Sequence, residues 1–292
     1  MTDGAAKYST HKDHGSRYSA VVGFLSKIFE RTLVGSIDMF NPWPELIATT
    51  NAAVISPSYR SASITNVVEE AEHSRSFEFA FHDDQTPSIT PGQFVPVRFR
   101  IGQSTHERCY AISSLVLRGD TPRFTVKRVA GGLVSNWCNE HLSAGTTIWI
   151  GQPAGLFKVR QNDSPIVFIA GGIGLAPIFP MLKEALLFGD RQVVLMIYDS
   201  EQRRVPFFDS LNELALQSGG RLRITETYVG SAGAVDAATI QRQLEPFVEA
   251  SLYMCGPSAF MDMAETAGLA AGISHRRIFT NSQADISERR SN

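Results

Sequence analysis

Cysteine is scarce in this chain of 292 residues: only Cys109, Cys138 and Cys255 occur, far apart in the sequence. None belongs to a C-x-x-C pair, so the spacing predicts neither a zinc site nor a disulfide framework. No metal-binding residues are therefore expected. Scattered, unpaired cysteines are typical of a protein of the reducing cytoplasm.

An excess of charge of one sign and long apolar runs are also lacking. The 27 basic and 29 acidic residues give a formal net charge of −2, whereas a chain that binds nucleic acid normally has a strong basic excess. Nucleic acid is therefore not an expected partner. The apolar stretch from Ala20 to Leu25 ends at Ser26 and Lys27, far short of the ~20 residues that span a membrane. The polar N-terminus is not followed by the apolar core of a secretory signal.

Residues 1–60 form an N-terminal extension in this interpretation. After a polar tail, apolar residues recur with helical period from Ala20 to Val34, which predicts an amphipathic helix that ends before Pro42 and Pro44. The helix either packs on the rest of the protein or docks on a partner protein or a membrane surface. Membrane contact is an open alternative, not the expectation.

Residues 61–160 contain short β-like runs at regular spacing, separated by turn signals such as Thr90-Pro91-Gly92. This rhythm predicts a small antiparallel barrel or sandwich. The runs are Ala62 to Val68, Ser76 to Phe81, Phe94 to Ile101, Arg123 to Val129 and Thr147 to Ile150.

Residues 161–292 change to alternating strands and helices after the polar linker Gln161 to Pro165. The first unit has the apolar run Ile166 to Ala170 and the helical pattern Pro177 to Phe188. Repeated strand and helix predicts a parallel sheet with helices on both faces. The later pairs are Val193 to Tyr198 with Phe207 to Gln217, Leu222 to Tyr228 with Ala237 to Leu244, and Leu252 to Cys255 with Ser258 to Leu269.

Two glycine turns follow strands of this second region. The turn Gly171 to Pro177 enters a helix, where backbone N–H groups and a positive dipole end suit a pyrophosphate; taken alone, it is equally well a tight connection. The turn Met254 to Pro257 also precedes a helix and is expected to face the same cleft. Cys255 is either a small buried hydrophobe or a neighbour of a nicotinamide ring, a place that requires no nucleophile.

The β-rich region offers two further features. Arg108 and Tyr110 lie on one face of a strand because side chains alternate, which suits a phosphate and a planar heterocycle or simply a surface arginine beside a half-buried tyrosine. The glycines before Ser135 precede the helix-like stretch Asn136 to Leu142, a second anion-binding N-terminus with Ser135 as its expected cap. Cys109 and Cys138 are interpreted as packing residues.

These pieces together resemble the ferredoxin:NADP reductase family of flavoproteins. The shared succession is R-x-Y-[ST]-x-S, K-R-x-x-G-G-x-x-S, G-x-P-x-G-x-F, G-G-x-G-x-x-P and C-G-P, found here at Arg108 to Ser113, Lys127 to Ser135, Gly151 to Phe157, Gly171 to Pro177 and Cys255 to Pro257. The resemblance covers roughly Ser61 to Phe279. Five motifs in order are specific even though each alone is not.

The resemblance implies a flavin-binding barrel at 61–160, followed by a nicotinamide-binding α/β domain at 161–292, with FAD and NADH or NADPH as cofactors. It places Arg108 on a flavin phosphate, Tyr110 against the flavin ring and Cys255 near the nicotinamide, so Tyr110 and Cys255 are the expected catalytic residues. The expected cofactor-binding residues are Arg108, Tyr110, Ala111, Ser113, Lys127, Gly131, Gly132, Leu133, Val134, Ser135, Gly171, Gly172, Gly174, Ala176, Pro177, Tyr198, Asp199, Cys255, Gly256 and Pro257.

The chain departs from the family pattern at several positions. Ala111 and Ala176 stand where hydroxyl residues are frequent, and Asn281 replaces an acidic residue before an aromatic position now held by Gln283. Glu201 stands where the family often has an arginine, which favours NADH. Arg203 and Arg204 follow closely and could reverse this, so the choice between NADH and NADPH stays open.

The function that the resemblance implies is an FAD-dependent reductase that takes hydride from NAD(P)H and passes electrons to a separate ferredoxin, rubredoxin, oxygenase or desaturase. The acceptor is expected to be separate because the C-x4-C-x2-C ligands of a plant-type iron-sulfur domain are missing from this sequence. Two alternatives stay open: a flavin reductase that releases reduced flavin, and a non-catalytic flavoprotein-like subunit.

Overall fold

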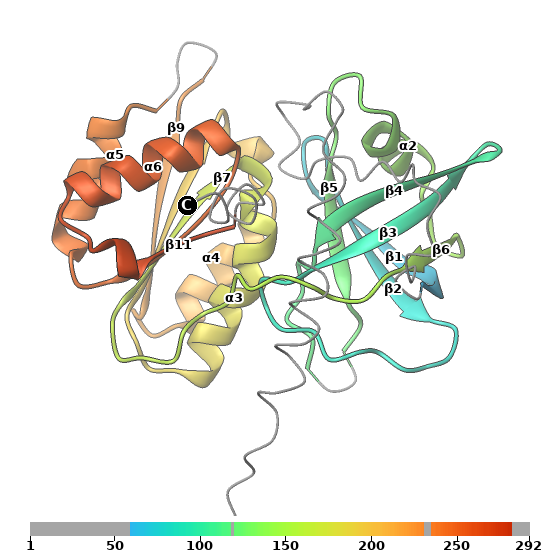
Figure 1. The fold of residues 1–292 in the computed structure, drawn as a ribbon, viewed down its shortest axis with the longest axis horizontal. Coiled ribbons are helices and arrows are strands. Elements are labelled where there is room, and N and C mark those ends of the chain that lie inside the picture. The colour runs from blue at the N-terminus through green and yellow to red at the C-terminus, as the bar shows by residue number, and fades with distance from the viewer. Residues whose placement is uncertain (1–58, 118–119, 231–234, 282–292) are drawn as a thin grey trace, which may run out of the picture.

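The computed structural model describes residues 59–117, 120–230 and 235–281. The amphipathic helix expected at 20–34 and the position Gln283 lie outside these ranges. Two bodies lie side by side, one built on an antiparallel sheet and one on a parallel sheet (Figure 1). In the part of the chain that is described, no helix is both long and apolar enough to cross a membrane.

The first body is a six-stranded antiparallel barrel. The spatial order of its strands is β4-β3-β6-β1-β2-β5, and a bridge between Ile112 and Phe124 joins the two outer edges. The strands are β1 (Arg60–Ala71), β2 (Ser74–Phe81), β3 (Phe94–Ile101), β4 (Ser104–Ala111), β5 (Arg123–Lys127) and β6 (Thr147–Ile150). The expected antiparallel architecture is confirmed, in the barrel form.

Aromatic side chains fill the barrel. Phe77, Phe79 and Phe124 are fully buried, and the Phe77 and Phe124 ring centroids lie 5.5 Å apart. Along β2, Phe77 and Phe79 are separated by the half-buried Glu78, as side-chain alternation in a strand predicts. Helix α2 (Leu133–His141) adds Val134 and Cys138 to the same core. It begins earlier than the expected Asn136, and its N-cap residue is Gly132, so the expected capping role of Ser135 is wrong.

The second body is a five-stranded parallel sheet in the order β11-β10-β7-β8-β9. Its strands are β7 (Ile166–Gly171), β8 (Val193–Asp199), β9 (Leu222–Tyr228), β10 (Ser251–Cys255) and β11 (Ile278–Thr280). Its helices are α3 (Leu175–Phe188), α4 (Phe208–Gln217), α5 (Ala237–Leu244) and α6 (Ser258–Ala270), with short 3₁₀ turns η1 (Gly172–Gly174), η2 (Gln202–Arg204), η3 (Glu245–Phe247) and η4 (His275–Arg277). The predicted parallel α/β arrangement is confirmed.

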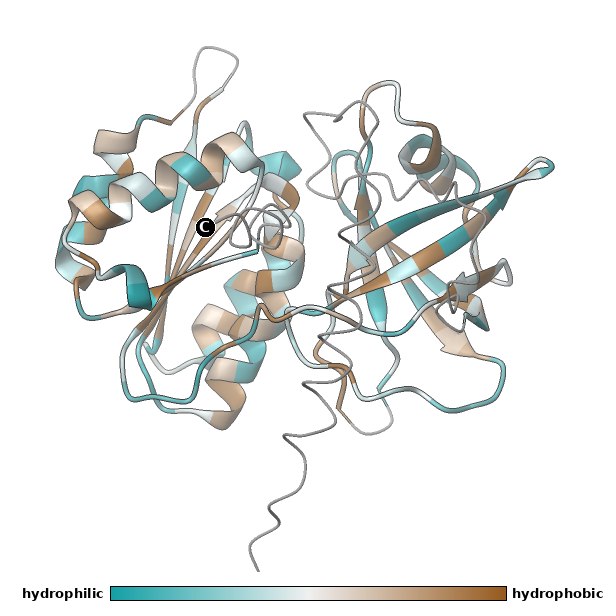
Figure 2. Ribbon diagram, viewed as in Figure 1, coloured by the Kyte–Doolittle hydropathy of each residue, from teal (hydrophilic) through white to brown (hydrophobic). Residues whose placement is uncertain are grey.

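The central strands β7, β8 and β10 contribute side chains to two buried cores, one on each face of the sheet. Phe168 and Leu195 pack with residues of α3 and α4 on one face, while Ile169 and Met196 pack with residues of α5 and α6 on the other. Because both faces are covered, the central strands are apolar throughout, and the polar residues gather on the outer sides of the helices (Figure 2).

The two bodies share an apolar contact. Ala111, at the end of barrel strand β4, and Phe157, in the segment between the bodies, belong to the same buried cluster as Leu175 and Cys255 of the α/β body. The barrel therefore packs on the α/β body through this cluster. The end of β5 reaches the carboxyl end of the parallel sheet, where Lys127 lies 3.8 Å from Asp199 and where such sheets bind ligands.

Candidate functional site at the junction of the two bodies

The two glycine turns of the parallel sheet pack directly against each other. A Cβ atom at Gly174 would lie 2.1 Å from the Cys255 carbonyl oxygen, so no side chain fits between the turns. Gly171 and Gly256 are closed off by the Phe260 ring, 2.7 and 2.8 Å from the same hypothetical atoms. These glycines permit close packing of the two turns, which together form one continuous rim at the ends of β7 and β10.

Gly172 is the glycine of this rim that faces the barrel. Its φ is +54°, in the left-handed region, and a Cβ atom there would lie 3.4 Å from Lys127 Nζ and 3.8 Å from Asp199 Oδ2. Lys127 ends barrel strand β5 and Asp199 ends β8; their charged atoms are 3.8 Å apart. One charge from each body therefore stands over the glycine turn.

The Asp199 carboxylate is almost entirely buried, with 5% of its side chain exposed. Its Oδ1 atom accepts hydrogen bonds from the Ser200 backbone N–H and hydroxyl, but Oδ2 has no hydrogen-bond donor. Buried polar atoms are normally paired. An atom left open toward Lys127 and Gly172 fits a place where a polar ligand binds.

Cys255 lies on the same rim with its thiol buried. Burial raises the pKa of this thiol to about 12, and the Asn281 side-chain amide lies 3.6 Å from Sγ as a donor. The thiol is therefore protonated at neutral pH and is not a nucleophile. This agrees with the expectation that its place, rather than its reactivity, matters.

Arg108 and Tyr110 on strand β4 meet at Cys138 of α2. Tyr110 hydrogen-bonds the Cys138 thiol, and the Arg108 charge acts on both groups. Burial raises the pKa of Tyr110 well above its ordinary value, with Cys138 as the next cause. One face of the Tyr110 ring stacks on Phe124, with centroids 5.3 Å apart. Cys138 is fully buried in the barrel core, which agrees with its interpretation as a packing residue.

Ser113 lies inside the barrel. Its hydroxyl accepts a hydrogen bond from Thr125 at 2.7 Å, and Thr125 in turn pairs with Ser76 at 2.7 Å. The side chain is fully buried. Of the other expected cofactor residues, Val134, Ala176, Pro177 and Tyr198 also have buried side chains. Such residues meet a ligand through their backbone or through the shape they give the site.

The glycine segment before α2 borders a surface hollow. No side chain caps this helix, so its first N–H groups stay available, as an anion-binding N-terminus requires. Ser135 Oγ instead accepts from Val129 N at 3.1 Å and fixes the turn. The hollow is lined by Gly131, Gly132, Leu133, Asn136, Trp137, Glu140 and His141. Asn136 and Trp137 were not predicted as site residues, although an aromatic residue one turn into the helix was visible in the sequence.

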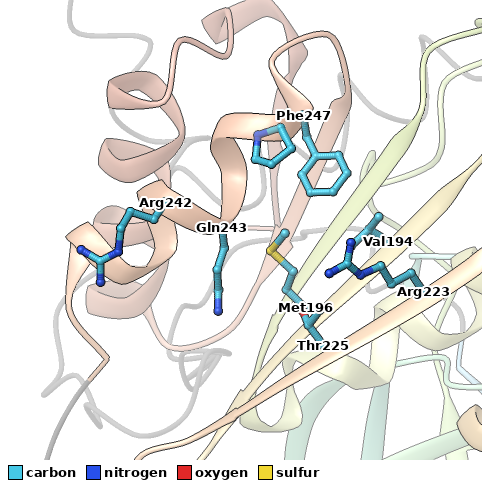
Figure 3. A pocket seen from close by; sticks show the side chains of 8 residues that line it. Val194, Met196, Arg223, Thr225, Arg242, Gln243 and Phe247 are labelled. Atoms are coloured by element: carbon cyan, nitrogen blue, oxygen red, sulfur yellow. The ribbon is translucent and has the colours of Figure 1, made fainter.

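A second hollow lies between the parallel sheet and α5 (Figure 3). It is lined by Val194, Met196, Arg223, Thr225, Arg242, Gln243, Pro246 and Phe247. None of the expected site residues lines it. Its link to them is the Tyr198 hydroxyl, which hydrogen-bonds Gln243.

Charged residues connect the bodies beside this rim. Glu72, in the turn between β1 and β2, forms ion pairs with Arg203 and Arg204 of η2 at 3.3 and 3.4 Å, and its backbone N–H donates to the Arg203 carbonyl at 2.9 Å. In the barrel, Arg123 pairs with Glu70 at 3.1 Å and lies over the Phe207 ring. Glu70, Glu72 and Arg123 were missed by sequence reasoning because no motif contains them.

The residues fit two bound dinucleotides. The uncapped α2 N-terminus, in a helix whose Cys138 lies near Arg108 and Tyr110, suits a flavin dinucleotide, and an open glycine turn beside Lys127 suits a nicotinamide dinucleotide. Fold and site together define the class: a two-domain oxidoreductase that binds a flavin and a nicotinamide cofactor.

Comparison with known proteins places the chain in a family. Residues 61–159 match the model of the oxidoreductase FAD-binding domain, and residues 168–266 match that of the oxidoreductase NAD-binding domain. The chain therefore belongs to the ferredoxin reductase-like family of FAD- and NAD-binding oxidoreductases. Its cofactors are accordingly FAD and a nicotinamide dinucleotide.

Among the relatives is the ferredoxin reductase component of the 3-ketosteroid-9-alpha-monooxygenase of Mycobacterium tuberculosis. It is 32% identical over 237 residues, covering 76% of this chain and 66% of the relative. The same component of Rhodococcus rhodochrous is 30% identical over 230 residues, with the same coverage. The chain thus spans a little under two thirds of the length of these relatives.

Solved structures share the fold. The FAD/NAD binding domain of a nitric oxide dioxygenase from Vibrio cholerae has a TM-score of 0.68 at 22% identity, covering 76% of this chain and 98% of the other. A cytochrome P450 reductase of Amycolatopsis has a TM-score of 0.67 at 22% identity, covering 80% and 73%.

Proposed function

We propose that this protein takes hydride from a nicotinamide dinucleotide onto FAD and passes the electrons to a separate acceptor protein. The observation that carries the proposal is the junction itself: Ala111, beside the flavin-ring candidate Tyr110, lies in one buried cluster with Cys255 of the second glycine turn. Two rings bound at these places would face each other, and alignment of reacting groups is the main contribution of a protein to such chemistry.

In this proposal the residues of the chain position the two cofactors and shield the junction from water. FAD, when bound, supplies a two-electron acceptor that can release electrons singly. Arg108 offers a cation to the phosphates of FAD, and the α2 N-terminus offers free N–H groups. Tyr110 offers an aromatic ring beside the flavin ring. Lys127 and Gly172 offer a cation and an open backbone to the nicotinamide dinucleotide. Cys255 closes the junction against water with an uncharged, buried thiol.

The acceptor is a separate iron-sulfur protein, rubredoxin, oxygenase or desaturase in this proposal. Its support is that the relatives are named as ferredoxin reductase components of a monooxygenase. The three cysteines are free and buried, which supports a reducing compartment such as the cytoplasm.

Anaerobic stopped-flow mixing with NADH or NADPH tests the proposal. The purified protein should carry FAD whose absorbance near ~450 nm bleaches on mixing, because the hydride reaches a bound flavin. A yellow protein that neither donor bleaches contradicts the proposal, and a protein that reduces only added flavin favours the flavin-reductase alternative.

A further inference from the structure

The loop after β8 contains charged residues where the ribose 2′-hydroxyl or 2′-phosphate of the nicotinamide dinucleotide is expected to bind. Gly171 pairs with Tyr198, so the glycine turn and the end of β8 lie side by side. In dinucleotide-binding sheets of this kind, an acidic residue at the end of the next strand accepts from the ribose 2′-hydroxyl, or an arginine nearby takes the 2′-phosphate of NADPH. Here this place has Glu201 as well as Arg203 and Arg204, so the sequence leaves the donor undecided.

Both arginines already have carboxylate partners in the structure. Arg203 Nε lies 2.5 Å from Glu201 Oε2 and 3.3 Å from Glu72 Oε2. Arg204 Nε lies 3.4 Å from the same Glu72 oxygen. The hydrogen bond from Arg203 is also the main reason why the pKa of Glu201 is lowered. Glu201 also lies within 3.9 Å of Arg204, so both carboxylates contact both arginines. Glu72 does so from the other domain, through the single buried oxygen Oε2.

The charges around the loop are balanced. Three cations, Lys127, Arg203 and Arg204, face three carboxylates, Glu72, Asp199 and Glu201. A 2′-phosphate would add about two negative charges and would have to displace carboxylates to reach the arginines. A 2′-hydroxyl adds none and can donate to a carboxylate.

We propose that Glu72, a residue of the flavin domain, determines the specificity for NADH by occupying Arg203 and Arg204 of the nicotinamide domain. This rests on the proposed function, because it concerns the donor of that reaction. The Glu72 backbone bond to Arg203 holds the turn against the loop, so the carboxylate stays in place whether or not a donor is bound.

The variant Glu72→Gln tests this with little change of shape. It keeps the backbone bond and removes one negative charge, so kcat/KM for NADPH should rise about tenfold, the effect of one added ionic contact of about 1.4 kcal/mol. The value for NADH should stay within about twofold. Glu69→Gln is the matched control: Glu69 lies on β1, shortly before the turn that contains Glu72, but pairs with Arg75 of its own domain at 2.7 Å, and neither donor should respond.

A binding measurement separates this inference from the proposed function. Calorimetric titration should show 2′,5′-ADP binding to Glu72→Gln about tenfold more tightly than to the unaltered protein, with 5′-AMP unchanged. Adding Arg204→Gln should cancel the gain. Equal changes for both ligands, or none, overturn the role of Glu72. If neither NADH nor NADPH bleaches the flavin of the unaltered protein, the proposed function fails, while the titration still decides on Glu72.

Discussion

At the scale of single residues, Gly174 is required because it has no Cβ atom, which allows the two glycine turns to pack against each other. Its φ of −57° suits any residue, so the glycine is required by space alone: a Cβ atom would lie 2.1 Å from the Cys255 carbonyl oxygen. Gly174→Ala should lower the free energy of unfolding by about 3 kcal/mol, because backbone cannot yield as a flexible side chain can. Chemical denaturation measures this. Gly268→Ala, which meets the flexible Leu252 side chain at 3.1 Å, should change it by less than about 1 kcal/mol.

Because its three thiols are buried, the native protein should not react with thiol reagents. Burial raises the pKa of Cys109 and of Cys255 from 9.0 to about 12, and raises that of Cys138 as well. At pH 8 only about one thiol in 10⁴ would be ionised at a pKa of 12, so a thiol reagent should modify none in the native protein and three after denaturation. Rapid loss of one native thiol would contradict this.

The same shifts give a pH dependence. Unfolded thiols release protons near their ordinary pKa of 9.0, whereas the folded thiols of Cys109 and Cys255 hold them to about 12. The folded state thus binds more protons above pH 9, and stability must fall as pH rises from 9 toward 12. Denaturation curves at pH 7, 9 and 10 check the sign. Replacement of both cysteines by Ala should flatten this part of the profile.

At the scale of elements, three buried hydroxyl groups connect strands where the barrel closes between β5 and the segment after β4. Ser76, Thr125 and Ser113 form a chain of 2.7 Å hydrogen bonds that links β2, β5 and the segment after β4. Thr125→Val should destabilise the protein by about 1–3 kcal/mol, because two buried hydroxyls lose their partner. Replacing all three by Ala, Val and Ala should cost less than the sum of the single changes. Thermal unfolding of the unaltered protein, the three single variants and the triple variant measures both.

Element type could be predicted from the sequence where one physical signal dominated. Strict alternation around Phe77 and Phe79 marked a half-buried strand, and the continuous apolar run from Ile166 marked a strand covered on both faces. The start of α2 was misplaced because Ser135 looks like a cap, whereas its hydroxyl bonds Val129 N instead. The short strand β11 has no pattern of its own; it forms because β10 offers an open edge.

The site could be predicted only where a motif carried it. The glycine turns and the pair Arg108 and Tyr110 could be named from spacing, since backbone approach and strand alternation are local properties. Glu72 could not, because its role exists only once the β1–β2 turn meets η2 across the junction.

At the scale of the whole molecule, the pair Lys127 and Asp199 predicts how the domains share the donor. Lys127 comes from the flavin domain and Asp199 from the nicotinamide domain, 3.8 Å apart over Gly172. A donor phosphate at this turn competes with Asp199 for the lysine. Asp199→Asn should therefore strengthen binding of NADH and NADPH alike, by about three- to tenfold, because the competing charge is gone.

This equal gain distinguishes Asp199 from Glu72, which should act on NADPH alone. Lys127→Gln should weaken both donors, and adding Asp199→Asn to it should bring no further gain, since the carboxylate then has no cation to release. Dissociation constants for the four proteins, from the donor dependence of flavin bleaching, complete this double-mutant cycle. A gain from Asp199→Asn that persists without Lys127 would mean that the carboxylate repels the donor directly, and the shared lysine would then have no part in binding.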